Sequence, residues 1–434
     1  MSEPAEAAAA RPFSGGRPYV VLGSLVIGLM LGILGAHSPP AVRSAALQFA
    51  GVVGGLWLDA LKMTVIPLVV ALLVTGIAKS AEAARAGRVA ARTVAWIVGI
   101  CTASAILGMA TIQLLTALFP ISGPAADALR QGAAALGSAP PPAVPKFADF
   151  FAAVIPPNVI AAASNGDVLP LVVFSVLFAL AVSRIAAAKR NAIVGLFDAI
   201  ADALLLIIGW VLWIAPVGIL ALAFTVGAAA GESAFAGLAH YIALVSTVGV
   251  LVTLLAYPIA IFAGRIGPGT FTRAMFAPQS VAVSTRSSLA SLPAMLASAR
   301  LIGVRDETAD VSLPIAVALL RATGPAMNVA VAFYVAHWLG YQPTFGQIVA
   351  ATAVGAVMSY AAISLPGEIT FISSIAPIAI ALGVPIAPLA LLVAVEMVPD
   401  IFRTLGNVTT DVAVAAAVDR GGGQRPAMAR TRSE

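Results

Sequence analysis

Apolar segments long enough to cross a bilayer recur along the whole chain. A membrane-spanning helix needs about 20 predominantly apolar residues. Eight segments reach that length, at residues 18–36, 45–78, 90–119, 150–183, 192–227, 236–264, 308–339 and 387–419. Several are longer than a bilayer requires, which indicates tilted helices or helices that extend into water. The pattern predicts an all-α integral membrane protein with eight transmembrane helices.

Two further apolar segments, 270–300 and 345–385, are interrupted at their centres. The interruptions are the run Thr-Arg-Ser-Ser at 285–288 and the run Ser-Leu-Pro-Gly at 364–367. Irregular backbone at membrane depth survives only where protein or a water-filled cavity surrounds it. Paired broken segments are the best sequence indication of a transporter's binding site. The two segments are therefore predicted to be re-entrant hairpins whose tips line a binding site.

Basic residues gather on one side of this predicted topology. On that side lie Arg11, Arg17, Lys79, Arg85, Arg88, Arg92, Arg184, Lys189, Arg190, Arg265, Arg273, Arg300, Arg305 and those from Arg420 onward. The opposite loops near 37–44, 228–235 and 340–346 contain only Arg43, and the loop at 120–149 contains just Arg130 and Lys146. The positive-inside rule then predicts that both termini are cytoplasmic. The hairpins enter from opposite sides, so their tips can meet near the midplane as inverted repeats.

The composition agrees with a protein covered by lipid. The chain has 434 residues, of which 60% are hydrophobic and 10% charged, whereas soluble domains have about 25% charged residues. Its single cysteine, Cys101, excludes an internal disulfide and a cysteine-based metal site. We expect cytoplasmic tails at 1–17 and 420–434. Between them, 18–264 contains the first six helices and 265–419 forms the transport core.

The last predicted span carries many polar residues. They are Glu396, Asp400, Arg403, Thr404, Asn407 and Asp411. At about 100° per residue, all of them except Thr404 fall on one stripe roughly 80° wide. Because a charge inside a span costs about 2.5–3.5 kcal/mol on insertion scales, the stripe indicates a functional cavity. The alternative is that these residues form ion pairs that only hold helices together, such as a local Asp400–Arg403 bridge.

The residue types on this stripe favour an anionic substrate. Arg403 presents a planar fork that can bind a carboxylate through two parallel hydrogen bonds. Half-helix N-termini near Ser287 and Ser288 would add favourable dipoles. Asp400 suits an amino group or a proton. Arg286, at the tip of the first hairpin, either joins this site or extends to the cytoplasmic surface.

Other classes of function have little support. The three histidines, His37, His240 and His337, lie near span ends and far from any nucleophile in sequence, so they are best explained as polar anchors. No HExxH spacing or Walker-type loop occurs, and the basic residues follow the topology rule instead of forming a nucleic-acid-binding patch. The chain is therefore not expected to be an enzyme, to need an enzymatic cofactor or to bind nucleic acid.

Four motifs, in order along the chain, resemble those of the dicarboxylate/amino acid:cation symporters, the family of glutamate and aspartate transporters. They lie at 155–169, 285–293, 365–367 and 400–411. The resemblance covers essentially the whole chain. It implies eight helices plus two hairpins, a homotrimer, an elevator-type movement of the transport core and a place in a bacterial-type inner membrane. It also implies symport of acidic amino acids or C4-dicarboxylates.

The resemblance also implies residue roles. Arg403 would bind the substrate's side-chain carboxylate and Asp400 its amino group, while Asn407 and Asp411 would contribute to a sodium site. The complete set of expected substrate-binding residues is Arg286, Ser287, Ser288, Pro366, Gly367, Asp400, Arg403, Thr404 and Asn407. Whether the substrate is an amino acid or a plain dicarboxylate stays open.

One motif departs from the family pattern. Where the family has Asn-Met-Asp-Gly-Thr on its seventh helix, this chain has Leu-Arg-Ala-Thr-Gly at 320–324. By the same resemblance, hydroxyl residues of the third helix are replaced around Ile97, Ile100 and Cys101. Sodium prefers oxygen ligands, and a guanidinium opposes it electrostatically. Ordinary sodium coupling is therefore not expected.

This departure leads to a hypothesis about coupling. Arg321 would act as a tethered cation that pairs with Asp411 or Glu396 where sodium would otherwise sit. Transport would then be proton-coupled or uncoupled, with Glu396, Asp400 or Glu368 carrying the proton. Two alternatives stay open: Arg321 points to an interface, or the chain is a dicarboxylate sensor, channel or uncoupled carrier on the same fold.

Overall fold

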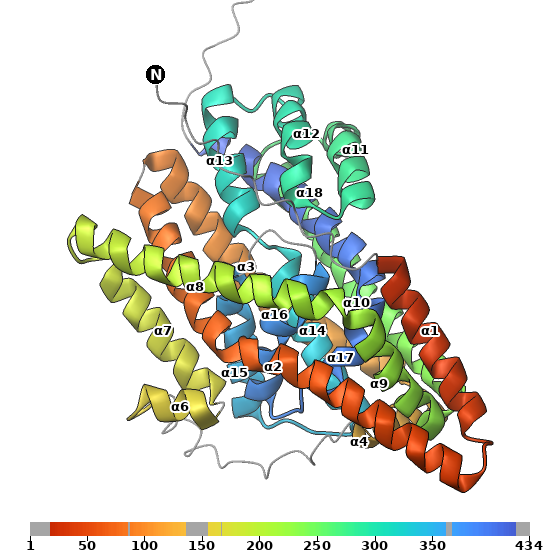
Figure 1. The fold of residues 1–434 in the computed structure, drawn as a ribbon. Coiled ribbons are helices and arrows are strands. Elements are labelled where there is room, and N and C mark those ends of the chain that lie inside the picture. Colours follow the sequence, from red (N-terminus) through yellow and green to blue (C-terminus); the bar gives the residue numbers. More distant parts are fainter. Residues whose placement is uncertain (1–17, 86, 136–154, 166, 362–366, 422–434) are drawn as a thin grey trace, which may run out of the picture.

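The computed structural model describes residues 18–85, 87–135, 155–165, 167–361 and 367–421. Within these ranges every regular element is a helix, in agreement with the all-α prediction (Figure 1). Five helical stretches there are long and apolar enough to cross a membrane. They are Pro40–Glu82, Arg88–Leu118, Ala187–Trp213, Ser233–Ala263 and Asp306–Trp338.

The first half of the chain forms a series of helices, several of them longer than 25 residues. They are α1 (Pro18–Gly35), α2 (Pro40–Arg85), α3 (Arg88–Leu118), α4 (Gly123–Ala135), α6 (Val159–Asn165), α7 (Val168–Val182), α8 (Ala187–Trp213), α9 (Ala215–Ala230) and α10 (Ser233–Pro258), which continues as η1 (Ile259–Ala263). The segment predicted as one span at 192–227 consists of two helices, α8 and α9, which meet at Ile214. Pro216 lies in the first turn of α9, where it needs no hydrogen-bond donor and favours a new helix start.

Each interrupted segment consists of two short helices. The first gives α11 (Pro268–Thr285) and α12 (Ser288–Leu301), which pack against each other. The second gives α15 (Phe345–Met358), extended by η2 (Ser359–Ala361), and α16 (Gly367–Leu382), which also pack together. The polar run 285–288 separates the first pair because Arg286 adopts a left-handed conformation with φ 51°.

The seventh and last predicted spans are also broken. Residues 308–339 contain α13 (Asp306–Leu319) and α14 (Thr323–Trp338), and the helix is interrupted at 320–322. The last segment begins with α17 (Leu389–Leu392) and η3 (Val393–Val395) and continues as α18 (Met397–Arg420). The last segment changes helix type but stays right-handed, whereas the break at 320–322 interrupts the helical hydrogen bonds in the interior of the molecule, where a ligand or side chain can use the freed groups.

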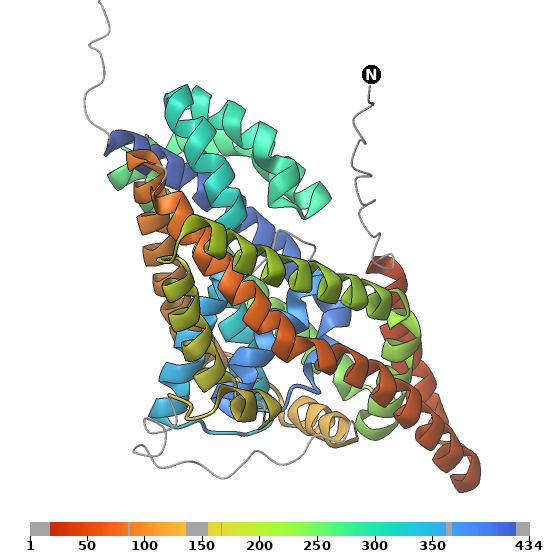
Figure 2. The same cartoon turned by 60° about the vertical axis from the view of Figure 1, so that its left-hand side comes forward.

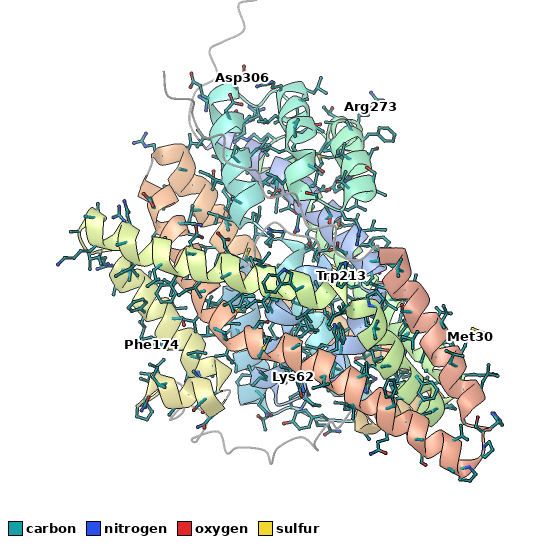
Figure 3. All side chains as sticks on the ribbon, viewed as in Figure 1. Met30, Lys62, Phe174, Trp213, Arg273 and Asp306 are labelled. Atoms are coloured by element: carbon teal, nitrogen blue, oxygen red, sulfur yellow. The ribbon has the colours of Figure 1, made fainter. Side chains whose placement is uncertain are left out.

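Helix α14 lies at the centre of the molecule. All of its residues except His337 are buried, and it contacts α3, α10, α15, α16 and α18 (Figure 2). By contrast, large apolar side chains of the outer helices are exposed. Met30, Phe174 and Trp213 are 54%, 37% and 73% exposed, and they point away from the bundle (Figure 3). This apolar exterior suits a lipid environment.

Candidate functional site

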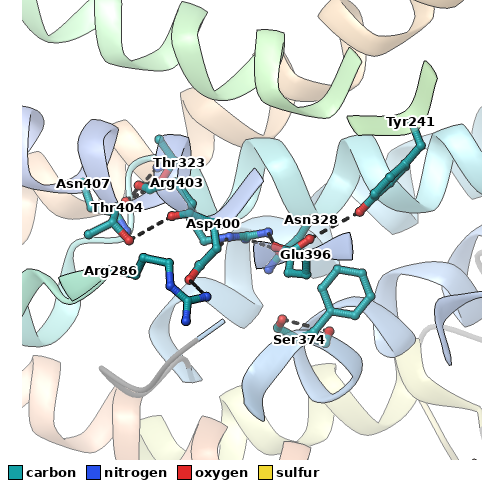
Figure 4. A network of polar contacts seen from close by, with 11 residues as sticks. Tyr241, Arg286, Thr323, Asn328, Ser374, Glu396, Asp400, Arg403, Thr404 and Asn407 are labelled. Carbon is teal, nitrogen blue, oxygen red and sulfur yellow. Dashed lines mark hydrogen bonds and ion pairs between the residues drawn. The ribbon is translucent and has the colours of Figure 1, made fainter. Parts of the chain in front are cut away.

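A connected group of polar side chains occupies the interior between four parts of the fold. It contains Tyr241 from α10, Arg286 from the turn between α11 and α12, Thr323 and Asn328 from α14, and Glu396, Asp400, Arg403, Thr404 and Asn407 from the last helix and its N-cap (Figure 4). We call this group the polar centre. Arg286 lies in the break between α11 and α12, and Thr323 directly follows the break at 320–322, so both breaks adjoin the polar centre.

Arg403 is the hub of the polar centre. Its Nη2 lies 2.5 Å from Glu396 Oε1, and its Nη1 donates a hydrogen bond of 2.5 Å to Asn328 Oδ1. Its Nε lies 3.6 Å from Asp400 Oδ1, which is an ion-pair distance without a hydrogen bond. The side chain is only 14% exposed. Each nitrogen of the fork therefore faces an acceptor, as a carboxylate-binding arginine requires.

The Glu396 carboxylate occupies one edge of the Arg403 guanidinium. The residue is fully buried. It follows the short helix η3 and is the N-cap of α18. Its second oxygen, Oε2, accepts a hydrogen bond of 3.4 Å from the Tyr241 hydroxyl. A buried carboxylate is stable only when cations and donors compensate its charge. Glu396 is thus held by groups that could equally hold a ligand.

Asp400 lies between two guanidinium groups. Its Oδ2 is 3.7 Å from Arg286 Nη1, and its Oδ1 is the oxygen that faces Arg403. Arg286 is 18% exposed in its side chain and points inward, so in this structure it joins the polar centre instead of extending to the surface (Figure 4). The left-handed backbone of Arg286 is uncommon for a residue with a Cβ, and such conformations concentrate at functional sites.

Asn407 connects α18 to the start of α14. Its Oδ1 accepts hydrogen bonds from the Thr323 amide at 3.0 Å and the Thr323 hydroxyl at 2.6 Å. The same hydroxyl lies 2.6 Å from the Arg403 carbonyl, so its single proton serves one acceptor at a time. Thr404 donates to the carbonyl of Asp400 within its own helix. These contacts keep the backbone of α18 in register with the break before Thr323.

The remaining predicted substrate-binding residues lie at the hairpin tips. Ser287 is the N-cap of α12, and its hydroxyl accepts a hydrogen bond of 3.2 Å from the Ala290 amide. Ser288 follows it and is buried. At the second tip, Gly367 is the first residue of α16, whereas Pro366 lies outside the described residues. Nothing is described of the Glu368 side chain.

The sequence matches one family of known proteins over most of its length. Residues 19–421 match the model of the sodium:dicarboxylate symporter family. The chain belongs to the sodium:dicarboxylate symporter family. A member of this family is a membrane transport protein and not an enzyme, and the matched region contains every residue of the polar centre.

Individual relatives in this family carry the names of carboxylate symporters. The chain is similar to the proton/glutamate-aspartate symporter of Escherichia coli, with 25% identity over 90% of this chain and 89% of the relative. It is similar to the proton/sodium-glutamate symport protein of Bacillus subtilis, with 25% identity over 94% and 93%. A C4-dicarboxylate transport protein of Anaeromyxobacter sp. is 27% identical over 92% and 89%.

The residues that this symporter has near Asp411 do not fit an ordinary sodium site. Asp411 is fully buried and could supply oxygens. However, Leu320 and Ala322 contribute only hydrocarbon side chains, and Arg321 between them brings a positive charge that acts directly on Asp411. The oxygen of Asn407 already accepts hydrogen bonds from Thr323. A sodium ion beside Asp411 would meet the positive charge of Arg321, so the local charge opposes it.

Several residues of the polar centre are absent from the sequence-based list of site residues. Asn328 was detectable in principle, because it is the single amide in the apolar run from Pro325 to Trp338. Tyr241 has no such signal, since its contact with Glu396 spans 155 positions of sequence. On α3, the buried Ser104 donates a short hydrogen bond to the Ala322 carbonyl, so a third-helix hydroxyl does meet the break.

Proposed function

We propose that this chain carries small carboxylates across the membrane together with protons, and that Arg403 binds the substrate's carboxylate. The observation that carries the proposal is the pairing of Arg403 with Glu396 inside the polar centre. A fixed guanidinium fork that already holds one carboxylate is complementary to another carboxylate of the same geometry. Asn328 keeps the fork in place while the carboxylates exchange.

Glu396 is the proton carrier in this proposal. When it is ionised, its carboxylate occupies Arg403 and competes with the substrate. When it is protonated, it loses the charge that attracts Arg403, and the fork becomes available. Tyr241 can orient either form, because its hydroxyl can donate to the carboxylate or accept from the acid. Proton binding and substrate binding thereby favour each other.

The charge balance of the core also supports proton coupling. In the described part of the chain, the polar centre and the neighbouring Arg321–Asp411 pair together contain three arginines (Arg286, Arg321, Arg403) and three carboxylates (Glu396, Asp400, Asp411), so their charges cancel. A dicarboxylate would add two negative charges to a buried, otherwise neutral site, and uncompensated buried charge is costly. One proton would balance an acidic amino acid, and two would balance a dicarboxylate.

Both substrate types named among the relatives suit this site. Arg286 and Arg403 face Asp400 from two directions and could bind the two carboxylates of a C4-dicarboxylate. For aspartate or glutamate, Asp400 would bind the amino group while Arg403 retains the side-chain carboxylate. We propose acidic amino acids and C4-dicarboxylates as the substrate class.

The same proposal includes an assembly and an orientation. The chain would form a homotrimer in the inner membrane with both termini in the cytoplasm, where the basic residues gather. Residues 265–419 would form a transport core that moves as an elevator against a scaffold from the first half of the chain. The exposed apolar side chains of α1, α7 and α8 are suited to the lipid and subunit contacts that this arrangement needs.

Uptake into proteoliposomes tests the proposed function. Labelled aspartate and labelled succinate would be offered to the purified full chain under an imposed proton gradient, and separately under a sodium gradient. We expect the proton gradient to drive accumulation of at least one substrate. Substrate binding without accumulation under either gradient would support the sensor or uncoupled carrier and contradict the proposal.

Replacement of the proposed proton carrier gives a second prediction. Glu396→Gln resembles the protonated side chain, so the variant should bind substrate but no longer couple to protons. Wild-type uptake should rise as the external pH falls from about 8 to about 6, by up to about tenfold per pH unit where one proton limits binding. Uptake by the variant should be nearly independent of pH, because the group that responds is gone.

The control for this experiment is Glu307→Gln, which makes the same chemical change on an exposed residue at the start of α13. Initial rates and exchange of internal for external substrate would be measured at each pH. The control should keep the wild-type pH profile. A Glu396→Gln variant that transports with an unchanged pH profile would show that another group carries the proton.

A further inference from the structure

The break between α13 and α14 places a guanidinium in the protein interior. Helix α13 ends at Leu319, and Leu320 turns to extended backbone with ψ 115° before α14 begins at Thr323. Arg321 lies in this break. Two of its nitrogens, Nε and Nη2, are sealed from solvent and have no hydrogen-bond partner. Buried arginine nitrogens without acceptors are unusual, because each costs the free energy of lost hydration.

A carboxylate that also lacks hydrogen-bond partners lies on the neighbouring helix α18. Asp411 of α18 is fully buried, and neither of its carboxylate oxygens accepts a hydrogen bond. Helix α18 packs against both α13 and α14. A buried carboxylate with no donor at all is among the least favourable states that a protein interior can hold, unless a cation lies close to it.

These two groups are each other's main counter-charge. Among the charged side chains that act on Arg321, Asp411 has the largest effect, ahead of Asp400 and Arg403. Arg321 is in turn the charged group that acts on Asp411. From α3, the buried Cys101 and Ser104 lie near the break, and Ser104 donates a hydrogen bond to the Ala322 carbonyl; neither carries a positive charge. Within the described part of the chain, Arg321 is therefore the cation best placed to balance Asp411.

The charge of this arginine cannot be removed at physiological pH, because guanidinium groups remain protonated in proteins. It is also covalently attached, so it has no entropy of binding to overcome and no dependence on external ion concentration. A free sodium ion entering beside Asp411 would have to share the carboxylate with a permanent cation in a low-dielectric interior, where like charges repel strongly.

We propose that Arg321 is a built-in cation that neutralises Asp411 in place of a sodium ion, so that carboxylate uptake by this chain does not need sodium. The proposal rests on the proposed function, because it explains how a carboxylate symporter on this fold can work without that ion. It also assigns a role to two buried groups that the pairing of Arg403 with Glu396 leaves unused.

The test removes the guanidinium and asks whether sodium becomes necessary. Arg321→Met keeps the length and apolar stem of the side chain but removes its charge, while Arg321→Lys keeps a charge. Two readouts would be used: uptake under a constant proton gradient in sodium or choline salts, and the melting temperature of the detergent-solubilised chain in the same salts. The second readout does not require transport, so it remains informative if the chain moves no substrate.

We expect wild type and Arg321→Lys to show no specific effect of sodium. For Arg321→Met, sodium should raise the melting temperature by about 5 °C relative to choline, because an ion that binds only the folded state stabilises it. Sodium should also raise the uptake rate of this variant by about tenfold. If Arg321→Met fails to fold, the double variant Arg321→Met/Asp411→Asn should restore folding, since it removes the uncompensated carboxylate as well.

Three results would overturn the proposal. Wild-type uptake or melting could depend on sodium. Arg321→Met could fold and transport as wild type does in both salts. The double variant could be no more stable than Arg321→Met, which would mean that Asp411 is not the partner. Absence of any uptake in wild type would instead contradict the proposed function, and the melting temperatures would still decide the role of Arg321.

Discussion

Carboxylate uptake should fall by roughly a hundredfold or more when Arg403 is replaced by alanine. Truncating one partner of a buried, hydrogen-bonded charge pair costs about 2–5 kcal/mol, and every 1.4 kcal/mol corresponds to tenfold. Two interactions are lost in this variant. The substrate carboxylate loses the guanidinium that binds it, and Glu396 loses its counter-charge at 2.5 Å. The initial rate of uptake into proteoliposomes over a range of substrate concentrations measures the effect.

Arg403→Lys should recover little of this activity. A lysine ammonium is a single point charge, so it cannot face Glu396, Asn328 and Asp400 along the three directions that the guanidinium uses. We expect the KM for substrate to rise strongly even where the protein folds normally. An arginine that served only to balance charge would instead be replaced by lysine with little loss.

Two control variants separate binding from folding. Arg300→Ala removes an arginine whose ion pairs with Asp306 and Asp310 are exposed, and such pairs are worth little, so uptake should stay near normal. The double variant Arg403→Gln/Glu396→Gln removes both buried charges together and should be more stable than Arg403→Ala. It should nevertheless bind no substrate. Near-normal uptake by Arg403→Ala would exclude Arg403 as the carboxylate-binding group.

Some features of the polar centre follow from the sequence alone. The polar run 285–288 interrupts an apolar segment and coincides with a helix break in the structure, whereas the break at 320–322 lies within 308–339, which the hydrophobic pattern predicts as one span. The polar stripe on the last helix can also be recognised in the sequence. Charged residues inside an apolar span are too costly to face lipid, so they indicate a polar interior. Local chemistry of this kind is encoded in neighbouring residues and can therefore be predicted.

Partner choice inside the polar centre was not predictable in the same way. Sequence spacing favours a bridge between Asp400 and Arg403, three residues apart, but the closer partner of Arg403 is Glu396, seven residues away. At about 100° per residue Glu396 and Arg403 fall on the same face of the last helix, two turns apart, but this periodicity does not decide which carboxylate lies closer to the guanidinium. Contacts with Tyr241 and Asn328 depend on how α10 and α14 pack against α18, which no local pattern contains.

The packing of α3 against α14 leads to the second large prediction. Gly108 of α3 lies so close to α14 that a Cβ atom there would be 2.3 Å from the carbonyl oxygen of Ala326 and 2.4 Å from its Cα. These are backbone atoms, which cannot move aside as a flexible side chain could. One turn earlier on α3, Ser104 contacts the Ala322 carbonyl at the edge of the helix break. Small residues at such positions allow membrane helices to approach closely.

Gly108→Val should therefore destabilise the protein by more than about 3 kcal/mol, because the helices must separate and Ser104 must leave the break that holds Arg321. Gly99→Val on the same helix is the matched control, since a Cβ at Gly99 meets no atom within 4 Å. The yield of monodisperse protein and its melting temperature in detergent would compare the two variants. We expect a near-normal Gly99→Val and a poorly folded Gly108→Val. Equal stability of the two variants would mean that α3 and α14 do not approach as closely as this structure has them, and Ser104 and Ala322 would then lose their role in shaping the break.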